Sequence, residues 1–167
     1  MKNDTNKVVE LLRSYRSKKR MIEQLRFELQ NPSQVTAAEL LRSMSIGRTE
    51  FSTVHSSGIS DKTMSVVAHY NDITDKMNIE TLDEIKRELR VLLKETEKLE
   101  HYVSLLDKNH SEIIRLRDFE GKPWCEIETE LNTTERRLRV RRTAAIEQLA
   151  AMYEFVDELM ENDQEEE

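Results

Sequence analysis

The spacing of apolar side chains predicts long helices and no strands. In residues 5–30 the apolar positions recur at alternating steps of three and four, the period of a helix that packs along a narrow seam. We expect this helix to end at Asn31 and Pro32, because proline cannot continue the hydrogen-bond ladder. The members of the seam are Val8, Leu11, Tyr15, Lys18, Ile22, Leu25 and Leu29.

Residues 61–106 carry the most regular seam of the chain. A stripe this narrow needs a partner helix, and helix 5–30 can fold back on it as an antiparallel coiled-coil hairpin. At about 1.5 Å per residue the two helices would be roughly 70 Å and 40 Å long, so dimerisation through 85–106 is the simplest way to bury the remainder. A break at Asn78 to Thr81 would instead split the long helix. The seam consists of Ile85, Leu89, Leu92, Thr96, Leu99, Val103 and Leu106.

The segment between these helices has weaker patterning. A short helix is expected near 36–44. Residues 45–60 contain Gly47, Gly58 and several serines with no apolar period, which is typical of a loop. Ser60 or Asp61 is placed to cap the helix that follows.

Residues 109–149 predict a helix-turn-helix. An apolar helix leads to a break at Glu120 to Pro123, and a short helix with Trp124, Ile127 and Leu131 follows. Pro123 suits the first turn of that helix, and Asn132 tolerates the left-handed conformation that ends one. Thr134 is a candidate cap for the last helix, where Glu135 sits favourably in the first turn.

The last helix has two different faces. At about 100° per residue, Leu138, Ala145, Leu149, Met152 and Val156 share one apolar stripe. Residues 134–143 carry five arginines and one glutamate in a chain of net charge −7. This arrangement is typical of a recognition helix, whose apolar side packs inward while its outer face enters the major groove of double-stranded DNA. The alternative is that the arginines pair with nearby glutamates.

The candidate DNA-contacting residues have separable roles. We expect Thr134, Arg137 and Arg141 to contact phosphates, and Arg136 and Arg139 to contact guanine edges or phosphates. Arg142 lies nearer the core edge and is expected to matter for folding more than for binding. The full candidate set is Thr134, Glu135, Arg136, Arg137, Arg139, Val140, Arg141 and Thr143.

Residues 113–149 resemble region 4 of sigma-70-type factors, the part that reads the promoter −35 element. The shared pattern is a leucine-rich helix, an EG turn, an aromatic residue followed by E-I, a second turn and a basic helix. Glu128, Asn132 and Thr133 depart from the alanine, glycine and aliphatic residue usual there. The matching residues are Glu120, Gly121, Trp124, Glu126, Ile127, Leu131, Thr134, Leu138, Arg141, Ala145 and Leu149.

The segment VHSSGISDKT at 54–63, followed by a long charged helix, is similar to phage and prophage regulators of Gram-positive bacteria. These are of the autolysin-regulator and late-gene-activator type (ArpU-like, RinA-like). The resemblance implies a transcriptional activator that binds promoter DNA and acts beside RNA polymerase. Residues 1–108 show nothing like the sigma region that melts the −10 element, so we expect an activator and not a sigma factor.

Composition supports an elongated all-α protein, with 37% hydrophobic and 35% charged residues, three glycines and two prolines. Cys125 is the single cysteine, and neither a signal peptide nor a membrane span is apparent, so a cytoplasmic setting is expected. Eight acidic residues and no basic ones lie in 154–167, which indicates a solubilising, partly disordered tail that could also compete with phosphate for the arginines.

The predicted organisation is a helical hairpin in 1–108 with a loop at 31–60, a DNA-binding domain in 109–153 and an acidic tail in 154–167. The four histidines lie far apart and no glycine-rich phosphate loop is present, so no catalytic, metal or cofactor site is expected, and no enzyme. Basic residues in 5–30 are interpreted as a solvated helix face, with a second DNA contact left open. The alternative function is a coiled-coil adaptor, such as a DNA-packaging or RNA polymerase-binding module.

Overall fold

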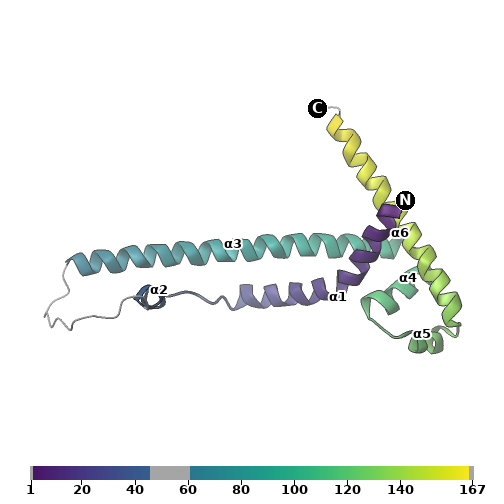
Figure 1. Cartoon of the computed structure of the whole chain (residues 1–167), viewed down its shortest axis with the longest axis horizontal. Helices are drawn as coiled ribbons and strands as arrows, with labels where there is room; N and C mark the ends of the chain where they lie inside the picture. Colours follow the sequence, from purple (N-terminus) through teal and green to yellow (C-terminus); the bar gives the residue numbers. More distant parts are fainter. Residues whose placement is uncertain (1, 46–60, 166–167) are drawn as a thin grey trace. The chain divides into compact units, whose positions relative to one another are not determined.

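The computed structural model describes the backbone of residues 2–45 and 61–165, and the side chains of 4–40, 42–43 and 68–159. This part of the chain is all-α, as the sequence predicts, and contains no strand (Figure 1). The serine-rich loop and the segment resembling phage regulators fall mostly outside the described residues. The elements are α1 (Lys2–Gln30), α2 (Ala37–Ser45), α3 (Asp61–Leu105), α4 (Lys108–Ile114), the π-helical turn η1 (Arg115–Phe119), α5 (Trp124–Leu131) and α6 (Glu135–Glu165).

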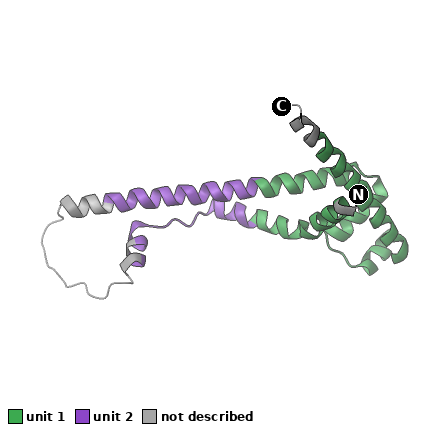
Figure 2. Ribbon diagram, turned by 45° about the horizontal axis from the view of Figure 1, so that its top comes forward, with its two compact units in different colours: residues 1–23, 91–167 green, residues 24–90 purple. Residues whose placement is uncertain are grey.

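The chain divides into two compact units (Figure 2). Unit 1 comprises Met1–Glu23 and Val91–Glu167, and unit 2 comprises Gln24–Arg90. The helices α1 and α3 each contribute residues to both units. The predicted basic helix therefore belongs to the same unit as the first half of α1.

Unit 1 has one hydrophobic core, to which α1, α3, α4, η1, α5 and α6 all contribute. The helix α6 packs against α4 and α5. From α1 the core takes Val8, Leu12 and Tyr15, whereas Leu11 is only half-buried. Leu11 packs against this core as predicted, and Leu12, which the seam did not include, is buried because at about 100° per residue it lies closer than Leu11 to the direction of Val8.

The seam of α3 is buried over the stretch that lies in unit 1. Leu92, Thr96, Leu99, Val103 and the following Leu106 are all buried, and the Thr96 hydroxyl donates to the Leu92 carbonyl at 2.9 Å. Much of this burial comes from the same chain, since Leu99, Val103 and Leu106 share a core with α1. This stretch of α3 is therefore buried without a second copy of the chain, and the homo-oligomer stays a prediction.

The suggested break at Asn78 to Thr81 is absent, because α3 is continuous from Asp61 to Leu105. The Thr81 hydroxyl donates to the Met77 carbonyl at 2.9 Å, one turn earlier in the same helix. Threonine here bonds within the helix and does not start a new one.

In unit 2 the chain after α1 is fixed by two local arrangements. Thr36 and Glu39 form a capping box at the start of α2, with the Thr36 hydroxyl accepting from the Glu39 N–H at 3.3 Å and the Glu39 carboxylate accepting from the Thr36 N–H at 2.9 Å. The Asn78 side chain pairs with both backbone groups of Val35, at 3.0 and 3.1 Å. These bonds confirm the short helix expected near 36–44.

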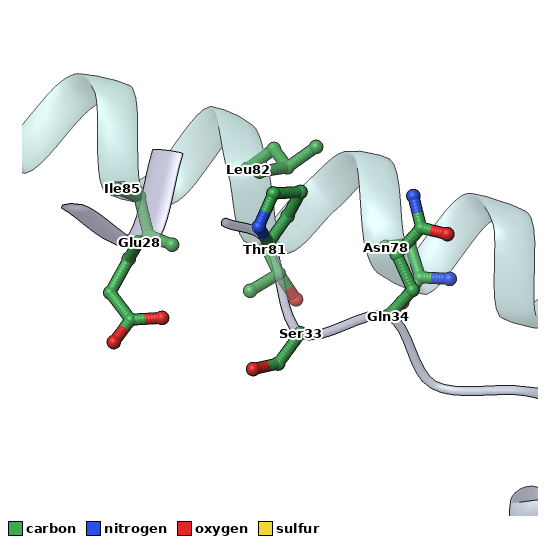
Figure 3. Close-up of a pocket in the computed structure, with 8 residues that line it drawn as sticks. Glu28, Ser33, Gln34, Asn78, Thr81, Leu82 and Ile85 are labelled. Atoms are coloured by element: carbon green, nitrogen blue, oxygen red, sulfur yellow. The ribbon is translucent and has the colours of Figure 1, made fainter. Parts of the chain in front are cut away.

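A small hollow lies beside this connection, between Ser33 and Gln34 on one side and the middle of α3 on the other (Figure 3). Its walls combine leucine, isoleucine and small polar side chains, and Glu28 is the one titratable group in its lining. A single carboxylate, with no second titratable group in the lining, does not indicate a catalytic or metal-binding site in this hollow.

The helix α6 continues into the acidic segment as far as Glu165. Lys7 of α1 pairs with Asp157 at 2.5 Å and lies 5.8 Å from the ring centre of Tyr153. Tyr153 in turn packs edge-on against Tyr102 of α3, with ring centres 4.8 Å apart. Burial, with the nearby negative charges, raises the pKa of Tyr153 to about 12.

Tyr15 connects three elements of unit 1. Its ring stacks on Phe119 of η1, with centres 3.9 Å apart and an interplanar angle of 22°. Its hydroxyl donates to the Glu100 carboxylate of α3 at 2.6 Å, and Lys19 binds the same carboxylate at 2.7 Å. Burial and the bond to Glu100 raise the pKa of the Tyr15 phenol. Tyr15 therefore helps to fix α1 against both η1 and α3.

We predict that Tyr15→Phe lowers the free energy of unfolding by about 1.5–3 kcal/mol, the contribution of a hydrogen bond to a charged group. Tyr15→Ala should cost roughly 3–5 kcal/mol, because it also removes the stacked ring. Urea denaturation followed by circular dichroism measures both, with Tyr70→Phe as a control that changes little.

The pH dependence of stability tests the contact between Tyr15 and Glu100 in a second way. Because the pKa of Tyr15 in the folded state lies above the ordinary value of 10.0, its stabilising contribution is complete below that pH and is lost as pH rises further. Tyr15→Phe should therefore lose less stability than the parent above pH 10. An identical alkaline loss in both proteins would contradict the assignment.

Candidate nucleic-acid interface

The helix before the candidate interface ends in a π-helical turn that the sequence pattern does not predict. Asp107 starts α4 by accepting from the His110 N–H at 3.0 Å, and Ile113 and Ile114 are buried as expected. The Glu120 N–H then donates to the Arg115 carbonyl at 2.8 Å, the five-residue step of a π-turn. Gly121 follows with φ of 75°, a conformation that favours glycine.

The short helix α5 is bounded by Pro123 and Asn132. Pro123 lies just before the helix and not inside its first turn, and its carbonyl accepts from the Glu126 and Ile127 N–H groups at 3.2 and 3.3 Å. Asn132 has φ of 45°, which confirms the predicted left-handed end. Ile127 is fully buried and anchors α5 in the core.

The start of α6 is capped by Glu128 of the preceding helix. The Glu128 carboxylate accepts a short hydrogen bond from the Glu135 N–H. Thr134 occupies the position before the helix, where its carbonyl accepts from the Arg137 and Leu138 N–H groups at 2.9 and 3.1 Å. A side-chain cap was predicted at this helix end, but the carboxylate that supplies the bond comes from seven residues earlier.

The inner face of α6 matches the predicted stripe. Leu138, Ala145 and Leu149 are fully buried, and Met152 packs against the same core as a half-buried residue. The helix thus has a fixed rotation, which determines the side chains that point outward.

The outward side chains of the first turns are mostly basic. Val140 is 66% exposed, so this face is not covered by another part of the described chain. Thr134, Arg136, Arg137, Arg139 and Thr143 are exposed as well, and Glu135 and Arg141 are half-buried. The structure therefore brings together the whole predicted set on the N-terminal turns of α6 and the residue before it.

Two of the five arginines have carboxylate partners. Arg142 forms a two-pronged pair with Asp118 of η1 at 2.6 and 2.9 Å, in which the side chains are 25% and 9% exposed. Arg139 pairs with Glu135 of its own helix at 2.5 Å. Within the described residues, Arg136, Arg137 and Arg141 have no carboxylate in ion-pair range. The alternative interpretation, that these arginines pair with nearby carboxylates, therefore holds for two of the five.

Trp124, predicted as a residue of the short helix, packs against the core and also borders this surface. The guanidinium carbons of Arg117 and Arg139 both lie over its half-buried ring, at 4.9 and 5.1 Å from the ring centre. An indole face attracts a cation and limits the rotamers of both arginines. Arg139 is thus held by Glu135 on one side and by Trp124 on another. The sequence showed an aromatic residue next to the EG turn, but it could not show that Arg117 and Arg139 contact this residue, because those contacts depend on the fold.

Comparisons with known proteins add no relative: no family model, no curated protein and no solved structure matches this chain. Among the described residues, no three His, Cys, Asp or Glu side chains come together to hold a metal ion. None of the helices, over the same residues, is long and apolar enough to cross a membrane.

We predict that Glu128→Ala lowers the free energy of unfolding by about 1–2 kcal/mol, because the first turn of α6 loses its acceptor. Glu128→Gln should cost less, since its amide oxygen can still accept the bond. Thr134→Ala is the matched control and should change stability by no more than a few tenths of a kcal/mol (about 0.5 at most). If Thr134→Ala proved the more costly change in urea denaturation, the cap would belong to Thr134.

Proposed function

We propose that this protein is a DNA-binding transcriptional regulator whose α5, turn and α6 form a helix-turn-helix. The observation that carries the proposal is the exposed arginine face on the first turns of α6, above an inner face fixed in the core. Recognition helices have this construction, with a buried side that fixes orientation and a polar side that enters the major groove.

The proposed role of each arginine depends on whether another side chain already holds its guanidinium group. Arg136 and Arg137 are exposed and have no carboxylate partner in the described chain, so they are available to guanine edges and phosphates. Arg139 is oriented before binding by Glu135 and Trp124, which lowers the entropy lost on contact. Arg141 and Thr143 would contact the backbone, and Val140 offers an apolar contact to a thymine methyl group.

The class of regulator rests on the resemblance to region 4 of sigma-70-type factors and to phage activators. It implies a cytoplasmic protein that acts beside RNA polymerase at a promoter. A homo-oligomer would suit two-fold symmetric sites, in which half-sites are separated by about one helical turn.

We predict that fragments selected from a random DNA pool share a sequence, and that Arg136→Ala costs roughly 1–3 kcal/mol on that sequence while relaxing its selectivity. Arg137→Ala should weaken all duplexes similarly and make the salt dependence shallower by about one unit. Gel-shift titrations across a salt series measure both effects.

Arg142→Ala serves as the contrasting variant, because it leaves Asp118 unpaired in a largely buried position. It should lower the free energy of unfolding by roughly 2–3 kcal/mol and leave selectivity unchanged in the folded fraction. Equal affinity of the parent for every duplex would contradict the regulator proposal and favour the adaptor alternative.

A further inference from the structure

A second group of arginines lines an open hollow in unit 1. Its walls come from α1, η1, the Gly121 turn, α5 and α6. Five arginines line it against one acid, Asp118, whose charge is already matched by Arg142. The hollow therefore presents net positive charge to any anion that enters it.

Two of these arginines belong to α1, far from α6 in sequence. The Arg16 guanidinium lies against Gly121, in the space that a side chain at this position would occupy. Arg16 has no carboxylate in ion-pair range within the described residues, and Arg13 approaches Glu10 at 3.9 Å with both side chains more than 70% exposed, at 74% and 78%. A pair this exposed contributes little, so Arg13 can exchange it for another anion.

An adjoining hollow is also lined mostly by basic residues. It shares Arg16 and is also lined by Lys19, Arg20 and Arg115, with Glu120 as its acid. The two hollows together are lined by eight basic residues and two acidic ones, and two of the basic residues, Lys19 and Arg139, are paired with Glu100 and Glu135 outside the lining. They form a basic strip that leads from α1 to Arg139, and Arg139 also belongs to the proposed recognition face.

We infer that the phosphate backbone of duplex DNA lies along this strip, so that Arg13 and Arg16 of α1 extend the interface beyond α6. The inference rests on the proposed function. Duplex DNA suits the strip because its charge is a continuous line of phosphates, about one charge per 1.7 Å of helix axis. The strip also continues directly from a residue of the proposed interface. Contacts of this kind add affinity without reading sequence.

The test compares the full-length parent with Arg13→Gln/Arg16→Gln. Binding is measured by fluorescence anisotropy on a random-sequence duplex and on the selected site across a salt series. The double variant should weaken both duplexes by a similar factor and make the salt slope shallower by about two units, one per lost phosphate contact. Selectivity between the duplexes should stay the same.

Two controls isolate the position of the lost charge. Lys94→Gln/Lys108→Gln removes the same charge from exposed residues that line neither hollow, and its slope should stay near that of the parent. Arg13→Lys/Arg16→Lys keeps the charge and should retain most of the slope. Circular dichroism confirms that each variant folds.

The outcomes separate this inference from the proposed function. A parent that binds the selected site, with an unchanged slope in Arg13→Gln/Arg16→Gln, overturns the α1 contact alone. A parent that binds no duplex overturns both proposals. If the double variant binds DNA like the parent but loses binding to a polyglutamate peptide, the strip serves an acidic protein segment and the inference is wrong.

Discussion

The stacking of Tyr15 on Phe119 is the contact on which the arrangement of unit 1 depends most. It joins the first helix of the chain to the π-helical turn before α5, while the Tyr15 hydroxyl joins the same helix to Glu100 of α3. Without it, Arg16 would lose its place against Gly121, because that place depends on the position of α1 relative to the turn. Arg142 acts in a similar way from the other side, since its pair with Asp118 fixes α6 to η1. Together these two contacts set the distance between the basic residues of α1 and those of α6.

The arginines concentrated in unit 1 repel one another, and this repulsion is reduced because some of them are paired with carboxylates. Arg142 is neutralised in a largely buried pair, and Arg139 is restrained by Glu135 and by the face of Trp124. Arg136, Arg137 and Arg16 keep their charge exposed. Glu128 adds a negative charge at the N-terminus of α6, where it satisfies a backbone N–H that could otherwise bind a phosphate. This makes side-chain arginines, and not the helix end, the proposed anion-binding groups.

Local chemistry allowed the sequence to predict the helices, the left-handed Asn132 and the inner stripe of α6, because each depends on neighbours within two turns. The sequence did not predict Glu128 as the cap of α6. A threonine directly before a helix is the usual cap, whereas Glu128 belongs to the preceding helix α5. The π-turn at Arg115–Phe119 has no known residue pattern to reveal it. The juxtaposition of Arg16 with Gly121 depends on the tertiary packing of distant helices, which periodicity cannot supply. The extent of α6 beyond residue 153 was not predicted because the composition there is acidic; in the structure Lys7 of α1 pairs with Asp157, and the packed Tyr153 lies directly before this segment.

On the proposed function, the arginine face of α6 binds duplex DNA at a defined sequence and in a defined orientation. Cys125 offers a direct measurement, because it is the single cysteine of the chain, is exposed, and lies in the first turn of α5 beside Trp124. A DNA-cleaving iron chelate attached to this thiol should cut a selected site at a few adjacent nucleotides on each strand. The same conjugate on random duplex should cut evenly and more weakly. Even cutting on every duplex, or no cutting at concentrations where the protein binds, would contradict the account.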